Sequence, residues 1–177
     1  MKEYRLGTVA DLLLSAQPLA LVGSILLLVF LSGIAIGVLH ATLMEALAGS
    51  LLAVLLHWIC SLAHHLGHAW AARRTGHPMR GIRLGMWGVL ATSIYPPDEP
   101  SLPAKIHIQR AFGGPLGSFL FSIVALVLAL VFRRVNETLG WAGTFFFLDN
   151  LLVFTLGPFL PLGFTDGSTL LQWWGKR

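Results

Sequence analysis

The sequence predicts an all-α membrane protein with about four transmembrane helices and a short β-containing cytoplasmic loop. Of its 177 residues, 55% are hydrophobic and only 11% are charged, and the mean hydropathy is +0.75. About 25% of the residues in a typical soluble domain are charged, so this composition excludes an ordinary soluble protein. We expect residues 1–177 to form a single polytopic membrane domain in a lipid bilayer.

Four apolar runs are long enough to cross a membrane. A transmembrane helix needs about 20 mostly apolar residues, and the runs that meet this length cover about residues 18–39, 43–70, 111–132 and 141–162. The first run is longer than the apolar part of a signal peptide, which is about 7–15 residues, and no clear small-residue cleavage site follows it. We therefore expect residues 1–40 to contribute an N-terminal membrane span.

The positions of the basic residues predict how the chain is oriented. Of the twelve Lys and Arg residues, only Arg133 and Arg134 fall on one side of a four-span arrangement, and the other ten fall on the opposite side. Because basic loops remain in the cytoplasm, we expect both termini and the loop of about residues 74–109 to be cytoplasmic, in a bacterial plasma membrane. The net charge of +4 reflects this flanking pattern, so we expect no binding to nucleic acid.

The central loop of about residues 74–109 has a pattern of its own. Apolar residues are interspersed with glycines between residues 79 and 95, which predicts short strands; these apolar positions are Ile82, Leu84, Met86, Val89 and Ile94. A turn-rich break follows at 95–100, and residues 102–110 are expected to form an interfacial helix. A strand near a membrane-embedded site can pair with an extended peptide by edge addition.

His64 and His68 are the strongest chemical signal in the chain. Two histidines four residues apart lie on one helical face, about one turn apart, so both imidazoles can reach one metal ion. Zinc proteases use the motif H-E-x-x-H, in which the Glu acts on the metal-bound water, and here His65 occupies the Glu position. Histidines within a membrane also form hydrogen bonds between helices or bind haem and other pigments, and these alternatives remain open.

Asp166 is the candidate third ligand. It follows a stretch rich in Pro and Gly, residues 158–163, that interrupts the fourth apolar run. Broken backbone at membrane depth is tolerated where it is buried in protein or lines a wet cavity. The alternative is that Asp166 caps a helix over residues 167–174, with its carboxylate accepting backbone N–H bonds.

Four segments, in order, match a set of family motifs. Residues 64–78 correspond to an H-E-x-G-H helix and its exit, and residues 84–91 to a strand segment containing Gly. Residues 111–118 correspond to an A-G-P-x-x-N helix opening, and residues 158–167 to an N-x-x-P-x-x-P-L-D-G motif. On these segments the chain resembles the site-2 protease family of intramembrane zinc metalloproteases. The resemblance covers about residues 43–175, and it implies a protease-like core preceded by one extra N-terminal span.

The resemblance implies a zinc ion held by His64, His68 and Asp166, with water in the fourth position. It also implies that the partner is a transmembrane helix of a substrate or other membrane protein, which is unwound and cut near the membrane face. His65 stands at the general-base position, so we expect a metalloendopeptidase homologue whose proteolysis is lost or impaired. Ser118 and Pro158 stand where the family has Asn.

Several alternatives remain open from the sequence. His65 can accept a proton as a neutral imidazole, or it can become an additional metal ligand that closes the site. Asp149, within the fourth run, can pair with a cation, accept a histidine proton or replace the missing base, while His57 is expected to form a hydrogen bond between spans. The rival function is a non-catalytic subunit that holds a partner's helix in a larger assembly, with pigment or haem association as a variant. The oligomeric state is not specified.

Overall fold

The computed structural model describes residues 2–176 and contains four helices that are long and apolar enough to cross a membrane. The first three are α1 (Pro18–Gly37), α2 (Leu43–Arg74) and α3 (Ala104–Phe132); the fourth is continuous from α4 (Glu137–Leu148) through a π-helical segment η1 (Asp149–Leu156) into the 3-10 turn η2 (Gly157–Phe159). A short helix, α5 (Asp166–Trp173), follows. The protein is therefore a multi-pass membrane protein, as the sequence predicts.

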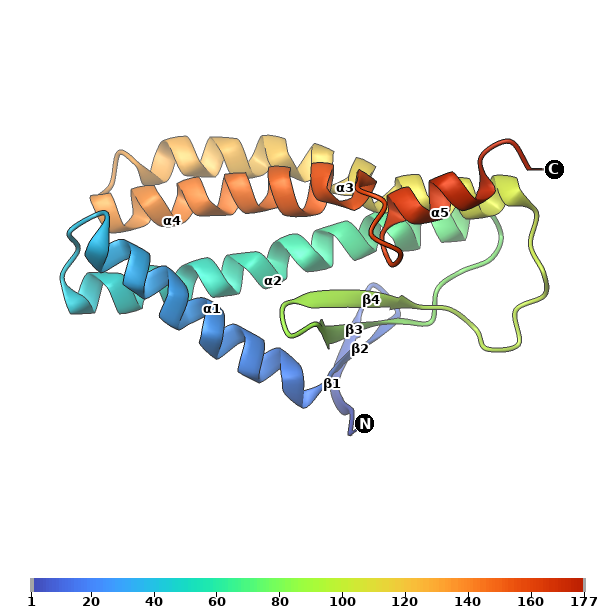
Figure 1. Ribbon diagram of the computed structural model, residues 1–177, viewed down its shortest axis with the longest axis horizontal. Helices are drawn as coiled ribbons and strands as arrows, with labels where there is room; N and C mark the ends of the chain where they lie inside the picture. Colours follow the sequence, from blue (N-terminus) through green and yellow to red (C-terminus); the bar gives the residue numbers. More distant parts are fainter. Residues whose placement is uncertain (1, 177) are drawn as a thin grey trace.

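Helix α2 is the central element of the fold. It contacts α1, α3, α4 and η1; α3 and α4 lie on one side of it, while α1 and a small sheet lie on the other (Figure 1). Its start is fixed by a capping box, in which Thr42 accepts from the Glu45 N–H and the Glu45 carboxylate accepts from the Thr42 N–H. Arg73 and Arg74 end it, where basic side chains suit the helix dipole.

Glycines bring α2 and α3 unusually close together. A Cβ added at Gly67 would lie 3.0 Å from the Gly113 carbonyl carbon, and one added at Gly117 would lie 2.9 Å from the Gly67 Cα atom. Small residues allow this approach, which in lipid is favoured by van der Waals contact rather than by hydrophobic burial. The close packing sets the start of α3 directly against the histidine-bearing end of α2.

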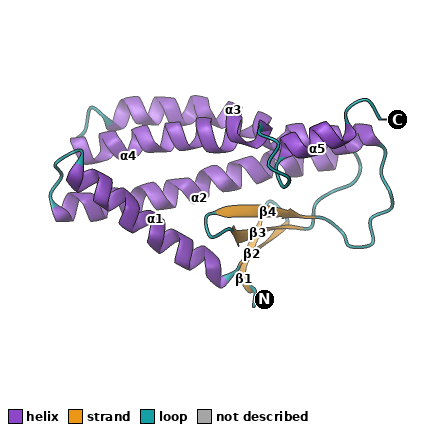
Figure 2. Cartoon of the chain, viewed as in Figure 1, coloured by secondary structure: helices purple, strands orange, loops and turns teal. Residues whose placement is uncertain are grey.

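The sheet contains four strands, drawn in orange in Figure 2: β1 (Tyr4–Val9), β2 (Leu12–Ala16), β3 (Gly81–Met86) and β4 (Leu90–Ile94). They are arranged in sequence order, with antiparallel hairpins β1–β2 and β3–β4 joined by a parallel β2–β3 pairing. The strands expected between residues 79 and 95 are present. The β1–β2 hairpin was not expected. Its parallel pairing to β3 joins residues 68 positions apart, such as Leu13 and Gly81, and no local sequence pattern indicates such a pairing.

The β3–β4 hairpin runs back along α2, which the sequence did not predict. The Val89 carbonyl, in its turn, contacts the ring of His57, and that residue lies about 25 Å along α2 from Arg74 at 1.5 Å per residue. The hairpin therefore lies beside the middle of α2 rather than beyond its last turn, and the expected β-containing loop between α2 and α3 is present.

Two helix boundaries also differ from the expected ones. Residues 104–110, expected to form part of a separate interfacial helix, are the first two turns of α3. The fourth span begins earlier than expected, at Glu137, where the Asn136 side chain accepts from the Leu139 N–H. Both boundaries were predicted from apolar content alone, so the predicted spans did not include the polar residues with which these helices begin.

Candidate metal centre

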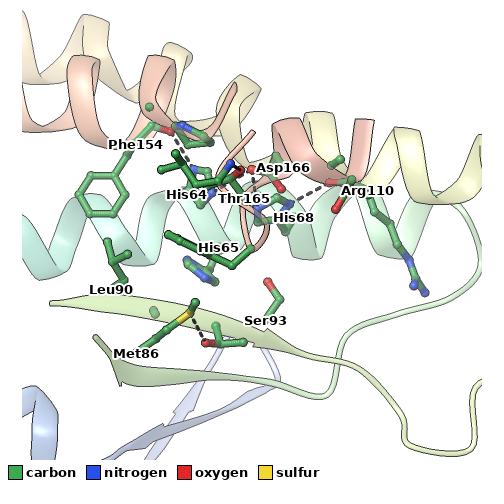
Figure 3. Close-up of a pocket in the computed structure, with 18 of the residues that line it drawn as sticks. His64, His65, His68, Met86, Leu90, Ser93, Arg110, Phe154, Thr165 and Asp166 are labelled. Carbon is green, nitrogen blue, oxygen red and sulfur yellow. Dashed lines mark hydrogen bonds and ion pairs between the residues drawn. The ribbon is translucent and has the colours of Figure 1, made fainter. Parts of the chain in front are cut away.

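His64, His68 and Asp166 converge on one point. The Oδ2 atom of Asp166 lies 3.5 Å from Nε2 of His64 and 3.4 Å from Nε2 of His68, and the two Nε2 atoms are 3.0 Å apart. One ligand atom from each residue lies within 4.8 Å of the others. Figure 3 shows the three side chains meeting where α2, α3 and the start of α5 come together.

Backbone carbonyls determine which ring nitrogens face the centre. Nδ1 of His64 lies 2.9 Å from the Phe154 carbonyl and Nδ1 of His68 lies 2.8 Å from the Arg110 carbonyl. A carbonyl only accepts, so each Nδ1 carries the hydrogen and each Nε2 carries a lone pair. The Gly114 N–H, 3.2 Å from Nδ1 of His68, is farther away and can only donate. Two lone pairs and a carboxylate that face one another at this distance suit a divalent cation.

The Phe154 carbonyl is available to His64 because regular π-helical pairing ends just after it. In a π-helix the carbonyl of residue 154 would accept from the N–H of residue 159, but η1 ends at Leu156 and residues 157–159 form a 3-10 turn. The hydroxyl of Ser118, which stands at one of the family's Asn positions, lies 3.2 Å from the same ring nitrogen of His64.

Gly114 leaves the space that the two imidazoles occupy. A Cβ added there would lie 2.6 Å from Nε2 of His64 and closer still to Nε2 of His68. Real Cβ atoms do not approach other heavy atoms this closely, so any side chain at this position displaces a ligand. The two adjacent glycines of the Ala111–Ser118 segment therefore have different roles. Gly113 faces Gly67 and allows α3 to pack closely against α2, whereas Gly114 faces the histidines and leaves room for their rings.

This space yields a prediction. Gly114→Ala is expected to weaken zinc binding by at least about tenfold, because loss of ligand orientation has effects of about 10–100-fold. Competition with a chromophoric chelator measures the affinity. Gly33→Ala on α1 is the matched control, since a Cβ there has no heavy atom within 4 Å. Equal affinities in both variants would contradict the geometry described for Gly114.

Asp166 is not a helix cap. It is the first residue of α5, and Thr165 occupies the cap position. The preceding loop is closed by polar contacts of its own: the Thr165 hydroxyl donates to the Leu160 carbonyl, and the Gly163 N–H donates to the Ser168 hydroxyl over 2.7 Å. The carboxylate of Asp166 is therefore directed toward the histidines, and the capping alternative is wrong.

His65 lies beside the converging set but does not join it. Its Nδ1 donates to the Ser61 carbonyl over 2.9 Å, and its ring centroid is 5.3 Å from that of His64 and 5.8 Å from that of His68. The ring is buried and points from α2 toward β4 (Figure 3). With Nδ1 protonated, Nε2 of His65 carries a lone pair. His65 is also not among the side chains whose ligand atoms converge within 4.8 Å, so this conformation does not favour it as a fourth ligand.

A cavity of about 660 Å³ adjoins the three histidines. Its other walls come from β4, from the start of α3 and from the segment between η1 and α5, with Ala91, Ser93, Ala111, Phe154 and Thr165 among the lining residues. The hydroxyl of Ser93 is buried and has no hydrogen-bond partner among the described residues. The cavity thus combines apolar walls with polar and charged side chains, Glu99, Arg110 and Asp166 among them, and such a mixture suits a binding site.

Arg110 connects the loop after β4 to His68. Its guanidinium forms a two-pronged ion pair with Glu99, at 2.9 and 2.5 Å, and lies 4.2 Å from the ring centroid of Tyr95. Arg110 lowers the pKa of the Glu99 carboxyl by this pairing, while burial raises the pKa of Tyr95 to about 12. The Arg110 carbonyl accepts from His68, so this ion pair steadies the residue that orients one ligand.

Asp149 and His57 form a separate pair. Nδ1 of His57 lies 3.0 Å from Oδ2 of Asp149, and both side chains are buried. Asp149 therefore has a basic partner, which was one of three roles open to it, and it is absent from the group of side chains that converge around His64. His57 bonds between spans, as expected. His107 lies in α3, within the stretch expected to be helical, and stacks on Trp173 of α5.

Comparison with known proteins identifies the architecture. No protein-family model matches this sequence, and no curated protein matches it significantly. A solved structure, the Site-2 Protease from Methanocaldococcus jannaschii, superposes with a TM-score of 0.62 over 97% of this chain and 70% of its own. The fold is that of a site-2 protease. At 18% identity the likeness establishes the fold, and it extends well beyond the region of residues 43–175 in which the motifs occur.

Within this site-2 protease fold, sequence reasoning found the residues that converge but missed those that orient them. The carbonyls of Phe154 and Arg110 carry no side-chain signal and emerge only from tertiary contacts. The contact of the Val89 carbonyl with His57 could not be predicted either, because every residue has a backbone carbonyl and the sequence does not indicate which partner it meets.

Proposed function

We propose that this protein is a zinc-binding homologue of the intramembrane metalloproteases, and that its cleavage of transmembrane helices is weak or lost because His65 replaces the general-base Glu. The observation that carries the zinc proposal is the convergence of two Nε2 lone pairs and one carboxylate within 4.8 Å. Two His and one acidic ligand form a donor set used by catalytic zinc sites, which keep the fourth position open. The space left by Gly114 supports the same arrangement.

A bound zinc ion would act as a Lewis acid and lower the pKa of a coordinated water to near 7. The protein's own groups then decide whether hydrolysis follows. Nε2 of His65 can accept a proton, but an imidazole carries no negative charge to offset the cation, and its nitrogen reaches a different point from a carboxylate oxygen. General bases contribute about 10²–10⁴-fold to rate, and this factor sets the expected loss.

The proposed substrate or partner is a transmembrane helix that presents an extended segment to β4. Strand β4 is at the edge of the sheet, and the Ile94 carbonyl accepts from the Arg80 N–H. Because backbone direction alternates along an antiparallel strand, the polar groups of Ala91 and Ser93 face away from β3, and both residues line the cavity. Edge addition there would satisfy these groups and place the added segment beside the histidines.

Proline at the free edge tests peptide capture. Ser93→Pro removes an outward N–H and is tolerated at an edge position, so we expect crosslinking of an extended apolar peptide to fall by about fivefold or more, given about 1 kcal/mol for a lost hydrogen bond. Ser93→Ala keeps the N–H and serves as the matched control for the loss of the hydroxyl. Zinc content is expected to stay unchanged in both. Undiminished capture by Ser93→Pro, with normal folding, would argue against β4 as the docking strand.

The function proposal as a whole is tested on purified protein in lipid nanodiscs. Elemental analysis measures zinc per chain, and incubation with a transmembrane peptide measures cleavage. Zinc without efficient cleavage supports the proposal, and a chain that neither binds zinc nor cleaves opposes it. The proposed orientation, with both termini in the cytoplasm of a bacterial plasma membrane, rests on the Lys and Arg distribution and is tested by reporter fusions to each terminus.

A non-catalytic subunit is the second candidate function. One observation favours it: the three candidate metal ligands are all present, but His65 stands where the zinc proteases have the general-base Glu. Such a protein would hold a partner's helix in the cavity without cutting it. Stable, stoichiometric co-purification of another membrane protein favours this role, whereas a solitary zinc-loaded protein favours the weak enzyme.

A further inference from the structure

The turn of the β3–β4 hairpin is held inside the helical layer by one histidine. Residues 87–89 join the strands, with Trp87 and Gly88 in the left-handed region at φ 53° and 89°. Nε2 of His57 lies 2.7 Å from the Val89 carbonyl. Because that carbonyl only accepts, Nε2 donates to it. A turn carbonyl left without a hydrogen-bond partner inside the protein would be costly, so this contact stabilises the hairpin where it lies.

Asp149 fixes the orientation of the His57 ring. Its carboxylate lies 3.0 Å from Nδ1, on the opposite side of the ring from Val89. The two side chains are 5% and 6% exposed, so water competes little for the ion pair. The ring is therefore held between an acceptor on the hairpin and an acceptor on the fourth span.

The same stretch of the fourth span also orients a metal ligand. Asp149 opens η1, and the next residue, Asn150, donates to the Ser118 carbonyl and to the Ser122 hydroxyl, both over 2.8 Å. Phe154, one π-helical turn later, accepts from His64. The hairpin and the ligand are thus positioned by one anchored segment, eight residues long.

Close packing against α1 fixes the hairpin turn on a further side. A Cβ added at Gly23 would lie 2.7 Å from the Gly88 Cα atom, so only glycine allows α1 to approach the turn. These contacts leave Trp87 72% exposed. The backbone of the turn, rather than its large side chain, is what the helices hold.

We propose that His57 is a positioning residue, which together with Asp149 fixes the β3–β4 hairpin to α2 and η1 and so holds the β4 edge at the depth of the metal centre. This inference deepens the proposed function, because it rests on β4 as the strand that receives the partner. His57 itself lies seven residues, or about 10 Å along α2, before His64. It therefore acts through the hairpin and takes no part in metal binding.

Hydrogen exchange of the hairpin amides tests the proposal directly. His57→Phe keeps the ring volume and removes both hydrogen bonds, so we expect amides of residues 81–94 to exchange about tenfold faster or more, with α3 unchanged. Asp149→Asn is the matched rescue: its amide can donate to Nδ1 while a neutral His57 still donates to Val89. We expect its exchange to stay within about threefold of the unaltered protein.

Each outcome separates this inference from the function proposal. Unchanged hairpin exchange in His57→Phe overturns the positioning role, and so does an Asp149→Asn variant as mobile as His57→Phe. If His57→Phe does not fold, His57→Gln is measured instead, because its single amide cannot reach both partners, and the same accelerated exchange is expected. Zinc content should be retained in every folded variant; absence of zinc from the unaltered chain would defeat the proposed function while leaving the exchange result to decide the role of His57.

Discussion

His64→Ala is expected to lower bound zinc from about one ion per chain to below about one tenth, because a site with two remaining protein ligands falls short of the three that catalytic zinc sites supply. The substitution removes a side chain that lies between the other two candidate ligands. Nε2 of His64 lies 3.0 Å from Nε2 of His68 and 3.5 Å from the Asp166 carboxylate, so its removal opens the centre of the ligand set. Elemental analysis after dialysis against a weak chelator measures the change.

The control for this loss is another histidine of the same chain. His77 follows α2 in the loop, and only its backbone carbonyl contacts Arg110, so His77→Ala should retain zinc. Circular dichroism checks that both variants keep their helices. Full zinc occupancy in His64→Ala, or equal losses in the two variants, would contradict the assignment of the metal centre.

His65→Glu is expected to raise peptide cleavage by about 10²–10⁴-fold, the usual contribution of a general base. The residue is on the helix turn that bears both histidine ligands, and its ring faces the cavity. A carboxylate there would supply both a proton acceptor and the negative charge that imidazole lacks. The measurement is the rate of zinc-dependent cleavage of a transmembrane peptide in nanodiscs, with zinc content determined on the same samples.

His65→Gln is the matched control, since it has nearly the size of Glu without a basic or charged group. It should cleave no faster than the unaltered protein. Robust zinc-dependent cleavage by the unaltered chain, unimproved in His65→Glu and diminished in His65→Gln, would show that His65 is itself a competent base. The impairment proposal would then be wrong, while the zinc centre would stand.

Much of the architecture was predictable because lipid constrains the chain so strongly. Backbone groups in a bilayer must be paired within the protein, so long apolar runs become helices, and four such helices are present. The spacing of His64 and His68 on one helical face is likewise local geometry. Asp166 was placed with them by its likeness to a motif, and the fold brings its carboxylate to within 3.5 Å of both rings.

The remaining features of the fold and the site depend on long-range contacts, because the groups that these contacts join leave no pattern in the sequence. The parallel pairing of β2 with β3, the carbonyl of Phe154 beside His64 and the carbonyl of Val89 beside His57 all involve backbone atoms that every residue possesses. Their partners depend on how helices cross and where a hairpin lies. The pairing of His64 with His68 thus follows from side-chain chemistry and spacing, and Asp166 was added by its likeness to a motif, whereas the ring nitrogens that face the centre, and the position of β4 beside it, follow from packing in three dimensions.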